Sequence, residues 1–135
     1  MEFDLSIRSL GLLEGMEPGL VTVVKLAASI CNVKFRVEKA TLGYINEVLL
    51  LSSVDKASEY PLFYVPIANA MKKAGKQHNM GVHWGGAWHI PDITTQVWSS
   101  EDMLWDYLDY SKTDPEGARV LVPSYFQINH KKASI

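Results

Sequence analysis

Cysteine is almost absent from this chain of 135 residues, in which Cys31 is the only one. A single thiol cannot form an intrachain disulfide and cannot build a Cys-rich metal site. Cys31 ends a row of apolar residues at helical spacing, a place that offers neither a base nor a positive environment. We therefore expect a buried, unreactive thiol and not a nucleophile.

A large excess of charge of one sign is also lacking. The chain has 13 Lys and Arg against 15 Asp and Glu, which gives a formal net charge of −2. A general nucleic-acid binder needs a strongly basic footprint, and this balance does not supply one. We therefore expect no direct binding of nucleic acid.

Long apolar runs are missing as well. The longest strictly apolar stretch covers residues 48–51, whereas a helix that spans a membrane needs about 20 residues. Near the N-terminus, Glu2 and Asp4 stand where a signal peptide requires positive charge, and no apolar segment follows them. These observations predict a cytoplasmic protein with no membrane segment.

The composition is that of an ordinary globular protein. Hydrophobic residues make up 47% of the chain, charged residues 21% and aromatic residues 10%. This mixture is neither disordered nor collagen-like, and the length suits one hydrophobic core. We expect a single domain over residues 1–135.

Two helices and a strand are predicted from hydrophobic spacing in the first part of the chain. Apolar residues recur at helical spacing from Pro18 to Cys31, and again over residues 66–76. Between them, Val33, Phe35 and Val37 alternate with charged residues, which is typical of a half-buried strand. The mainly apolar run at residues 45–51 is compatible with a buried strand or with a helix segment.

The second half of the chain predicts two strands and a helix. Residues 82–88 and 120–128 are typical of strands, and Pro123 would confine the second to an edge or a bulge. Between them, Ser99 and Asp102 form a weak capping box before a helical pattern that extends to Tyr110. Together these elements predict a small α+β domain, with helices packed on a mostly antiparallel sheet.

Three collinear segments resemble a known family. They are RSLGLLEGMEPGLV at residues 8–21, VHWGGAW at residues 82–88, and PSYFQI at residues 123–128. They are similar to motifs of phage endolysins of the zinc-dependent M15 peptidase family, the L-alanyl-D-glutamate and D-Ala-D-Ala peptidase type. The resemblance implies the fold of that family and a substrate cleft beside the strands.

The residues expected to bind zinc in that family differ here. Aligned on the resemblance, the three ligand positions hold Lys56, Phe63 and Tyr125, and Val122 replaces the acid that serves as general base. A protonated ammonium cannot bind zinc, and Phe has no donor atom. We therefore expect a degenerate, catalytically inactive protein without zinc or another cofactor. The resemblance places Lys56 and Tyr125 at the old cleft.

Other residues could still serve chemistry or binding. The histidines at 78, 83 and 89, with Asp92 nearby, match no zinc-binding helix motif, so we expect ordinary surface or loop histidines. The resemblance places Trp84 and Trp88 on a strand beside the old cleft, whereas aromatic residues of this kind more often pack in a core.

Residues 91–121 are the largest departure from the family, because its corresponding segment is often much shorter. We interpret this segment as inserted or remodelled. Within it, Asp102, Asp106 and Asp109 share one face of the predicted helix, next to Trp105 and Tyr110. Residues 99–116 hold six acids against one base. The three aspartates, Trp105 and Tyr110 are either partner-binding residues or part of an ordinary solvated helix face.

The hypothesis that follows is an inactive, endolysin-like phage protein that binds and inhibits a bacterial or phage protein with a basic surface. Inhibitors of bacterial defence nucleases, such as anti-CRISPR proteins, are a suitable class, because an acidic aromatic patch can occupy a site meant for nucleic acid. Such a protein would act in the cytoplasm of the host cell. The alternatives are a non-catalytic module that binds cell-wall peptide and, third, an active zinc peptidase with shifted ligands.

Overall fold

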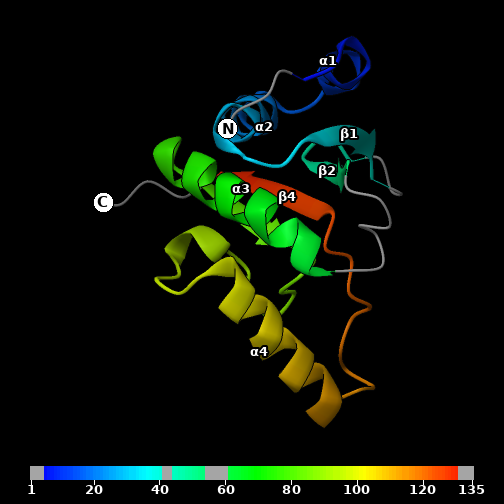
Figure 1. Cartoon of the computed structure of the whole chain (residues 1–135), viewed down its shortest axis with the longest axis vertical. Coiled ribbons are helices and arrows are strands. Elements are labelled where there is room, and N and C mark those ends of the chain that lie inside the picture. Colours follow the sequence, from blue (N-terminus) through cyan, green and yellow to red (C-terminus); the bar gives the residue numbers. More distant parts are fainter. Residues whose placement is uncertain (1–4, 41–43, 54–60, 131–135) are drawn as a thin grey trace.

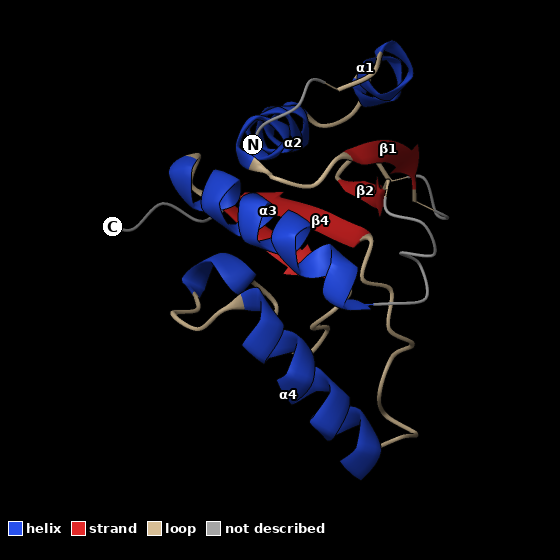
Figure 2. Cartoon of the chain, in the orientation of Figure 1, coloured by secondary structure: helices blue, strands red, loops and turns tan. Residues whose placement is uncertain are grey.

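The computed structural model describes residues 5–40, 44–53 and 61–130, which form an α+β fold (Figures 1 and 2). Its elements in chain order are α1 (Ile7–Leu13), α2 (Pro18–Ile30), β1 (Phe35–Lys39), β2 (Glu47–Ser52), the 3-10 helix η2 (Pro61–Tyr64), α3 (Val65–Gln77), β3 (Met80–Trp84), the 3-10 helix η3 (Ile93–Thr95), α4 (Ser100–Thr113) and β4 (Tyr125–His130). The predicted fold class is confirmed. In the described residues, none of the helices has the length and apolar character to cross a membrane.

The four strands form one sheet in the order β1-β2-β4-β3, and every pairing in it is antiparallel. The ambiguous run at residues 45–51 is therefore a strand, which covers Glu47–Ser52. The last strand lies between β2 and β3, so the expectation of an edge position or a bulge was wrong. Pro123 precedes the strand, where its missing N–H does not interrupt the ladder.

The two faces of the sheet differ in what covers them. On one face, side chains such as Val48, Leu50, Phe126 and Trp84 are buried in the main core. The helices α2 and α3 pack against each other and against β4 and β3, and Figure 1 shows α3 crossing in front of β4. Because side chains alternate along a strand, the residues between these core positions point to the opposite side, which we call the outer face. The side chains of the outer face include Glu47, Leu49, His83, Tyr125 and Gln127.

The N-terminal helices are held by capping and by contacts with residues far along the chain. Pro18 stands in the first turn of α2, and the Glu17 carboxylate accepts the N–H of Leu20 at 3.0 Å, which confirms the predicted helix. The helix α1 was not predicted. It is short, and its Ser9 hydroxyl accepts the N–H of Val37 in β1, 28 residues away.

The predicted helix of the second half is α4, which begins after Ser99 and continues to Thr113. The Ser99 hydroxyl accepts the N–H of Asp102 at 3.1 Å. Met103, Leu104 and Tyr107 are buried, whereas the far end of the helix extends away from the sheet (Figure 1). A long loop then returns from α4 to β4 (Figure 2).

Candidate functional site

The exposed side of α4 carries an aromatic residue surrounded by acids. Trp105 is 48% exposed, although large aromatic side chains are usually buried. Glu101, Asp102 and Asp109 lie three or four residues from it along the helix, and all three are exposed. We call these four residues the α4 face. They include three of the predicted partner-binding positions.

Asp106 and Tyr110, the other two predicted positions, are also exposed, but both contact His89. The Asp106 carboxylate lies 2.7 Å from Nε2 of His89, and the Tyr110 ring stacks on the same imidazole, with ring centroids 5.9 Å apart. The spacing does place Asp102, Asp106 and Asp109 on one exposed side, but Asp106 has a partner in the turn after β3.

A carboxylate and a phenol meet on the outer face of the sheet. The Tyr125 hydroxyl of β4 donates a hydrogen bond to Oε2 of Glu47 in β2. Burial, followed by this bond to a carboxylate, raises the pKa of Tyr125 well above its ordinary value, so the phenol stays protonated. Glu47 is only 7% exposed, and its other oxygen, Oε1, has no hydrogen-bond partner among the described residues.

Trp88 is enclosed beside this pair. Its ring centroid lies 4.9 Å from that of Tyr125, and the Arg119 guanidinium carbon lies 3.7 Å above its ring centre. The indole N–H donates to the Val120 carbonyl at 2.8 Å, and the imidazole of His83 meets the ring edge-on. Trp88 thus contacts Tyr125, Arg119 and His83, and it is only 9% exposed.

The turn at Gly85 and Gly86 explains how Trp88 reaches this position. The predicted strand over residues 82–88 ends at Trp84, so Trp88 lies in a turn and not on a strand. The N–H of Val122 donates to the Gly85 carbonyl at 3.0 Å, which holds the returning loop against the turn. A Cβ atom at Gly85 would overlap the Val122 carbonyl, so glycine permits this close approach. The loop that precedes β4 therefore lies beside the expected cleft.

The other residues proposed for the old cleft are placed differently from one another. Trp84 is fully buried on the core side, where it stacks on Phe126 and donates its indole N–H to the Pro123 carbonyl at 2.7 Å. Of the two interpretations of Trp84, packing in the core is therefore the one that the structure supports. Lys56 lies outside the described residues. Phe63 lies in η2, just before α3, and is 38% exposed.

The histidines do not form one cluster with Asp92. The Asp92 carboxylate accepts the N–H groups of Val82 and Thr94, and so it holds η3 against β3. Nε2 of His83 lies 3.0 Å from the Trp88 carbonyl. Over residues 5–40, 44–53 and 61–130, no three His, Cys, Asp or Glu side chains are arranged to hold a metal ion.

Cys31 has the surroundings that its position predicts. It is 2% exposed at the end of α2, and burial raises the pKa of its thiol above the ordinary value. The thiol lies 3.7 Å from the Pro66 carbonyl. The expectation of a buried thiol is therefore confirmed.

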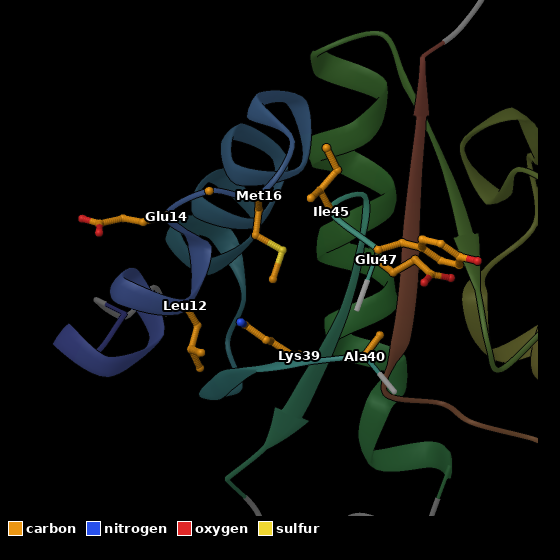
Figure 3. A pocket seen from close by; sticks show the side chains of 9 residues that line it. Leu12, Glu14, Met16, Lys39, Ala40, Ile45 and Glu47 are labelled. Carbon is orange, nitrogen blue, oxygen red and sulfur yellow. The ribbon is translucent and has the colours of Figure 1, made fainter. Parts of the chain in front are cut away.

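Glu47 and Arg119 are not among the residues that the sequence predicts for the site. The signal for Glu47 was available, because it is an acid directly before the apolar run that forms β2. Glu47 also borders a hollow of about 250 Å³ between the turn after α1 and the first two strands. Figure 3 shows the ammonium of Lys39 turned toward Met16, whereas the Glu47 carboxylate points away from it toward β4.

The comparisons with known proteins show a likeness of structure. No protein-family model matches this sequence, and no curated protein matches it. The crystal structure of the L-Ala D-Glu endopeptidase ChiX from Serratia marcescens is similar, with a TM-score of 0.61 over 95% of this chain and 91% of that chain. The two sequences are 19% identical over this match. The likeness therefore concerns the fold alone, and this chain has a peptidase-like fold.

Proposed function

We propose that this protein binds a protein partner with a basic surface through the α4 face and does not hydrolyse peptides. The observation that carries the proposal is the half-exposed Trp105 among Glu101, Asp102 and Asp109. An aromatic anchor of this kind dominates the binding energy of many interfaces, and rim charges speed the encounter with a partner of opposite charge.

Contacts of side chains on the outer face support the proposed lack of peptidase activity. At the third ligand position of the resembling family stands Tyr125, a protonated phenol bonded to Glu47. The ring nitrogen of His83 that faces Trp88 is occupied by a main-chain carbonyl. Side chains engaged in this way favour a structural role over binding of a metal or a nucleophilic water.

The proposed partner is a bacterial or phage protein, and the proposed place of action is the cytoplasm of a host cell. A basic surface that normally binds nucleic acid would complement the three carboxylates of the α4 face. Inhibition of a defence nuclease, as by an anti-CRISPR protein, is the biological role that this chemistry suits best.

The partner is to be identified by pull-down from a bacterial lysate and mass spectrometry, and binding is then measured with the purified pair. Replacing Glu101, Asp102 and Asp109 by their amides should slow association at low salt, and added salt should reduce the difference. Trp105→Ala should speed dissociation roughly thirtyfold, because truncating an anchor costs about 2 kcal/mol. Glu14→Gln, which removes one exposed carboxylate outside this face, is the control for each of the three replacements made singly.

Two results would contradict the proposal. If the folded triple variant binds as fast and as tightly as the parent at low salt, the α4 face is not the binding surface. If elemental analysis finds about one zinc per chain, and a chelator removes it together with peptidase activity, the protein is an active enzyme.

A second candidate function is binding of a cell-wall peptide at the outer face without cleavage. The observation in its favour is Arg119, which is held over Trp88 and forms no ion pair with a carboxylate of the described residues. A guanidinium without an ion-pair partner can bind a peptide carboxylate. Co-sedimentation with purified cell walls, lost in Arg119→Gln and kept in Arg36→Gln, would favour this candidate over the first.

A further inference from the structure

A groove with a basic lining lies on the opposite side of α3 from its buried residues. It runs between α3 and the segment that follows β3, and its volume is about 610 Å³. This volume falls within the range of about 300–1,000 Å³ that is usual for small-molecule sites. Its lining consists of Asn69, Lys72, Lys73, Lys76, Thr94, Thr95, Gln96 and Val97.

The charge of this groove is of one sign. Lys72, Lys73 and Lys76 line it, whereas none of the lining residues is acidic. No carboxylate of the described residues forms an ion pair with any of the three. The chain as a whole has a net charge of −2, so this positive charge is a local feature.

Two of the three ammonium groups, those of Lys72 and Lys76, also repel each other. The Lys72 ammonium donates to the Trp98 carbonyl at 2.7 Å, which fixes it at the groove. Burial, followed by the nearby charge of Lys76, lowers the pKa of Lys72. A bound anion would relieve this repulsion and form charge-assisted hydrogen bonds with the ammonium groups.

One neutral donor is placed beside them. Oδ1 of Asn69 accepts the N–H of Ser100, the first residue of α4, at a distance of 3.4 Å. Its side-chain N–H₂ group has no hydrogen bond to another described residue, which leaves it free to donate to a ligand.

We propose that this groove binds a compact anion with a phosphate chain, such as inorganic diphosphate or a nucleoside diphosphate. Three lysines without acidic partners suit a ligand with several negative charges. An extended nucleic acid suits the groove less well, because α4 begins at its end and carries Glu101 and Asp102 in its first turn. The site is separate from the α4 face, and the inference does not depend on the partner proposed above.

The test measures binding of inorganic diphosphate and of ADP to the full chain, by calorimetry and by amide chemical shifts, at constant ionic strength. The test variant is Lys73→Gln with Lys76→Gln, because Lys72 also bonds to Trp98 and its loss could disturb the fold. Lys25→Gln with Lys34→Gln changes the net charge equally at exposed sites elsewhere and serves as the control.

We expect both probes to bind, with shifts concentrated at residues 69–76 and 94–98. Affinity should fall about tenfold in the test variant, because each charge-assisted contact contributes severalfold, and should stay near the parent value in the control. Tighter binding of ADP would identify a nucleotide as the source of the phosphate chain, and equal binding would identify the inorganic anion.

Any of four results would overturn the inference. Three of them are no binding of either probe at millimolar concentration, an equal loss of affinity in the test and control variants, and shifts that lie outside the groove. Tighter binding of a single-stranded oligonucleotide than of both probes would also overturn it, since the ligand would then be extended.

Discussion

The His89 imidazole and the Asp106 carboxylate lie 2.7 Å apart and join the turn after β3 to the middle of α4. Tyr107 and Tyr110 pack against the same imidazole, with centroid distances of 5.2 Å and 5.9 Å. One of the three aspartates thus holds α4 to the rest of the molecule, while its neighbours on the helix are exposed. On the acidic side of α4, Asp106 therefore attaches the helix to His89, whereas Asp102 and Asp109 are available to a partner.

This pairing predicts that the three aspartates contribute differently to stability. Asp106→Asn should lower the free energy of unfolding by up to about 1 kcal/mol, because the pair is partly exposed. Asp109→Asn should leave it nearly unchanged, whereas Asp102→Asn should lower it by about 0.3 kcal/mol, because Asp102 lies in the first turn of α4, where a carboxylate interacts favourably with the helix N-terminus. Urea denaturation of the three single variants measures the difference. Equal stabilities of all three would show that the His89 contact contributes nothing.

Tyr125→Phe should destabilise the protein by about 1–3 kcal/mol, because it leaves the buried Glu47 carboxylate without a hydrogen bond. Adding Glu47→Leu to this variant should restore part of the loss, since both polar partners are then gone. Guanidinium denaturation of the single and double variants tests this. A double variant less stable than Tyr125→Phe would contradict the pairing.

Gly85→Ala should cost about 2–3 kcal/mol, because the added Cβ would force the Val122 carbonyl away from the turn. Gly11→Ala is the matched control, since Gly11 lies in α1 with no atom within 4 Å of the added Cβ. The control should gain up to about 1 kcal/mol from the better helix propensity of alanine. Thermal unfolding of both variants measures the contrast, and similar melting temperatures would contradict the close approach at Gly85.

The lowered pKa of Glu17 predicts that the protein loses stability in acid. Burial by itself would raise the pKa of Glu17, but hydrogen bonds from His130 and from the N–H groups of Gly19 and Leu20 outweigh burial and lower that pKa. A carboxyl group with a depressed folded pKa stabilises the protein above its unfolded pKa, and this stabilisation is lost as pH falls through the folded pKa. Free energies of unfolding measured between about pH 5 and pH 3 should fall less steeply in Glu17→Gln than in the parent. Parallel slopes would contradict this role.

The elements that local sequence predicts well are those whose stabilising contacts are local. The helix α2 has its cap and its apolar side within one segment, so Pro18 and Glu17 identify its start. The helix α1 is missed because its Ser9 bonds to Val37, far along the chain. The predicted strand over residues 82–88 is too long, because the turn at Gly85 depends on Val122 of a distant loop.

The same limit applies to the candidate site. Helical spacing places Asp102, Asp106 and Asp109 on one side of α4, but it cannot show that His89, 17 residues before Asp106, takes one of them. Trp84 and Trp88 share a spacing that suits one strand face, yet the turn sends Trp88 to the outer face while Trp84 stays in the core. The partner role of the α4 face stays a prediction that binding experiments must test.

The position of β4 has a consequence for folding during translation. This strand follows every other described element in the chain, yet it lies between β2 and β3 and supplies the pairing partner of both. During translation, β4 is therefore the last described element to leave the ribosome. Until then, β2 and β3 each have a strand edge without its pairing partner. Such edges invite pairing with other chains, so the nascent protein is most prone to aggregation in the interval before β4 can pair with β2 and β3.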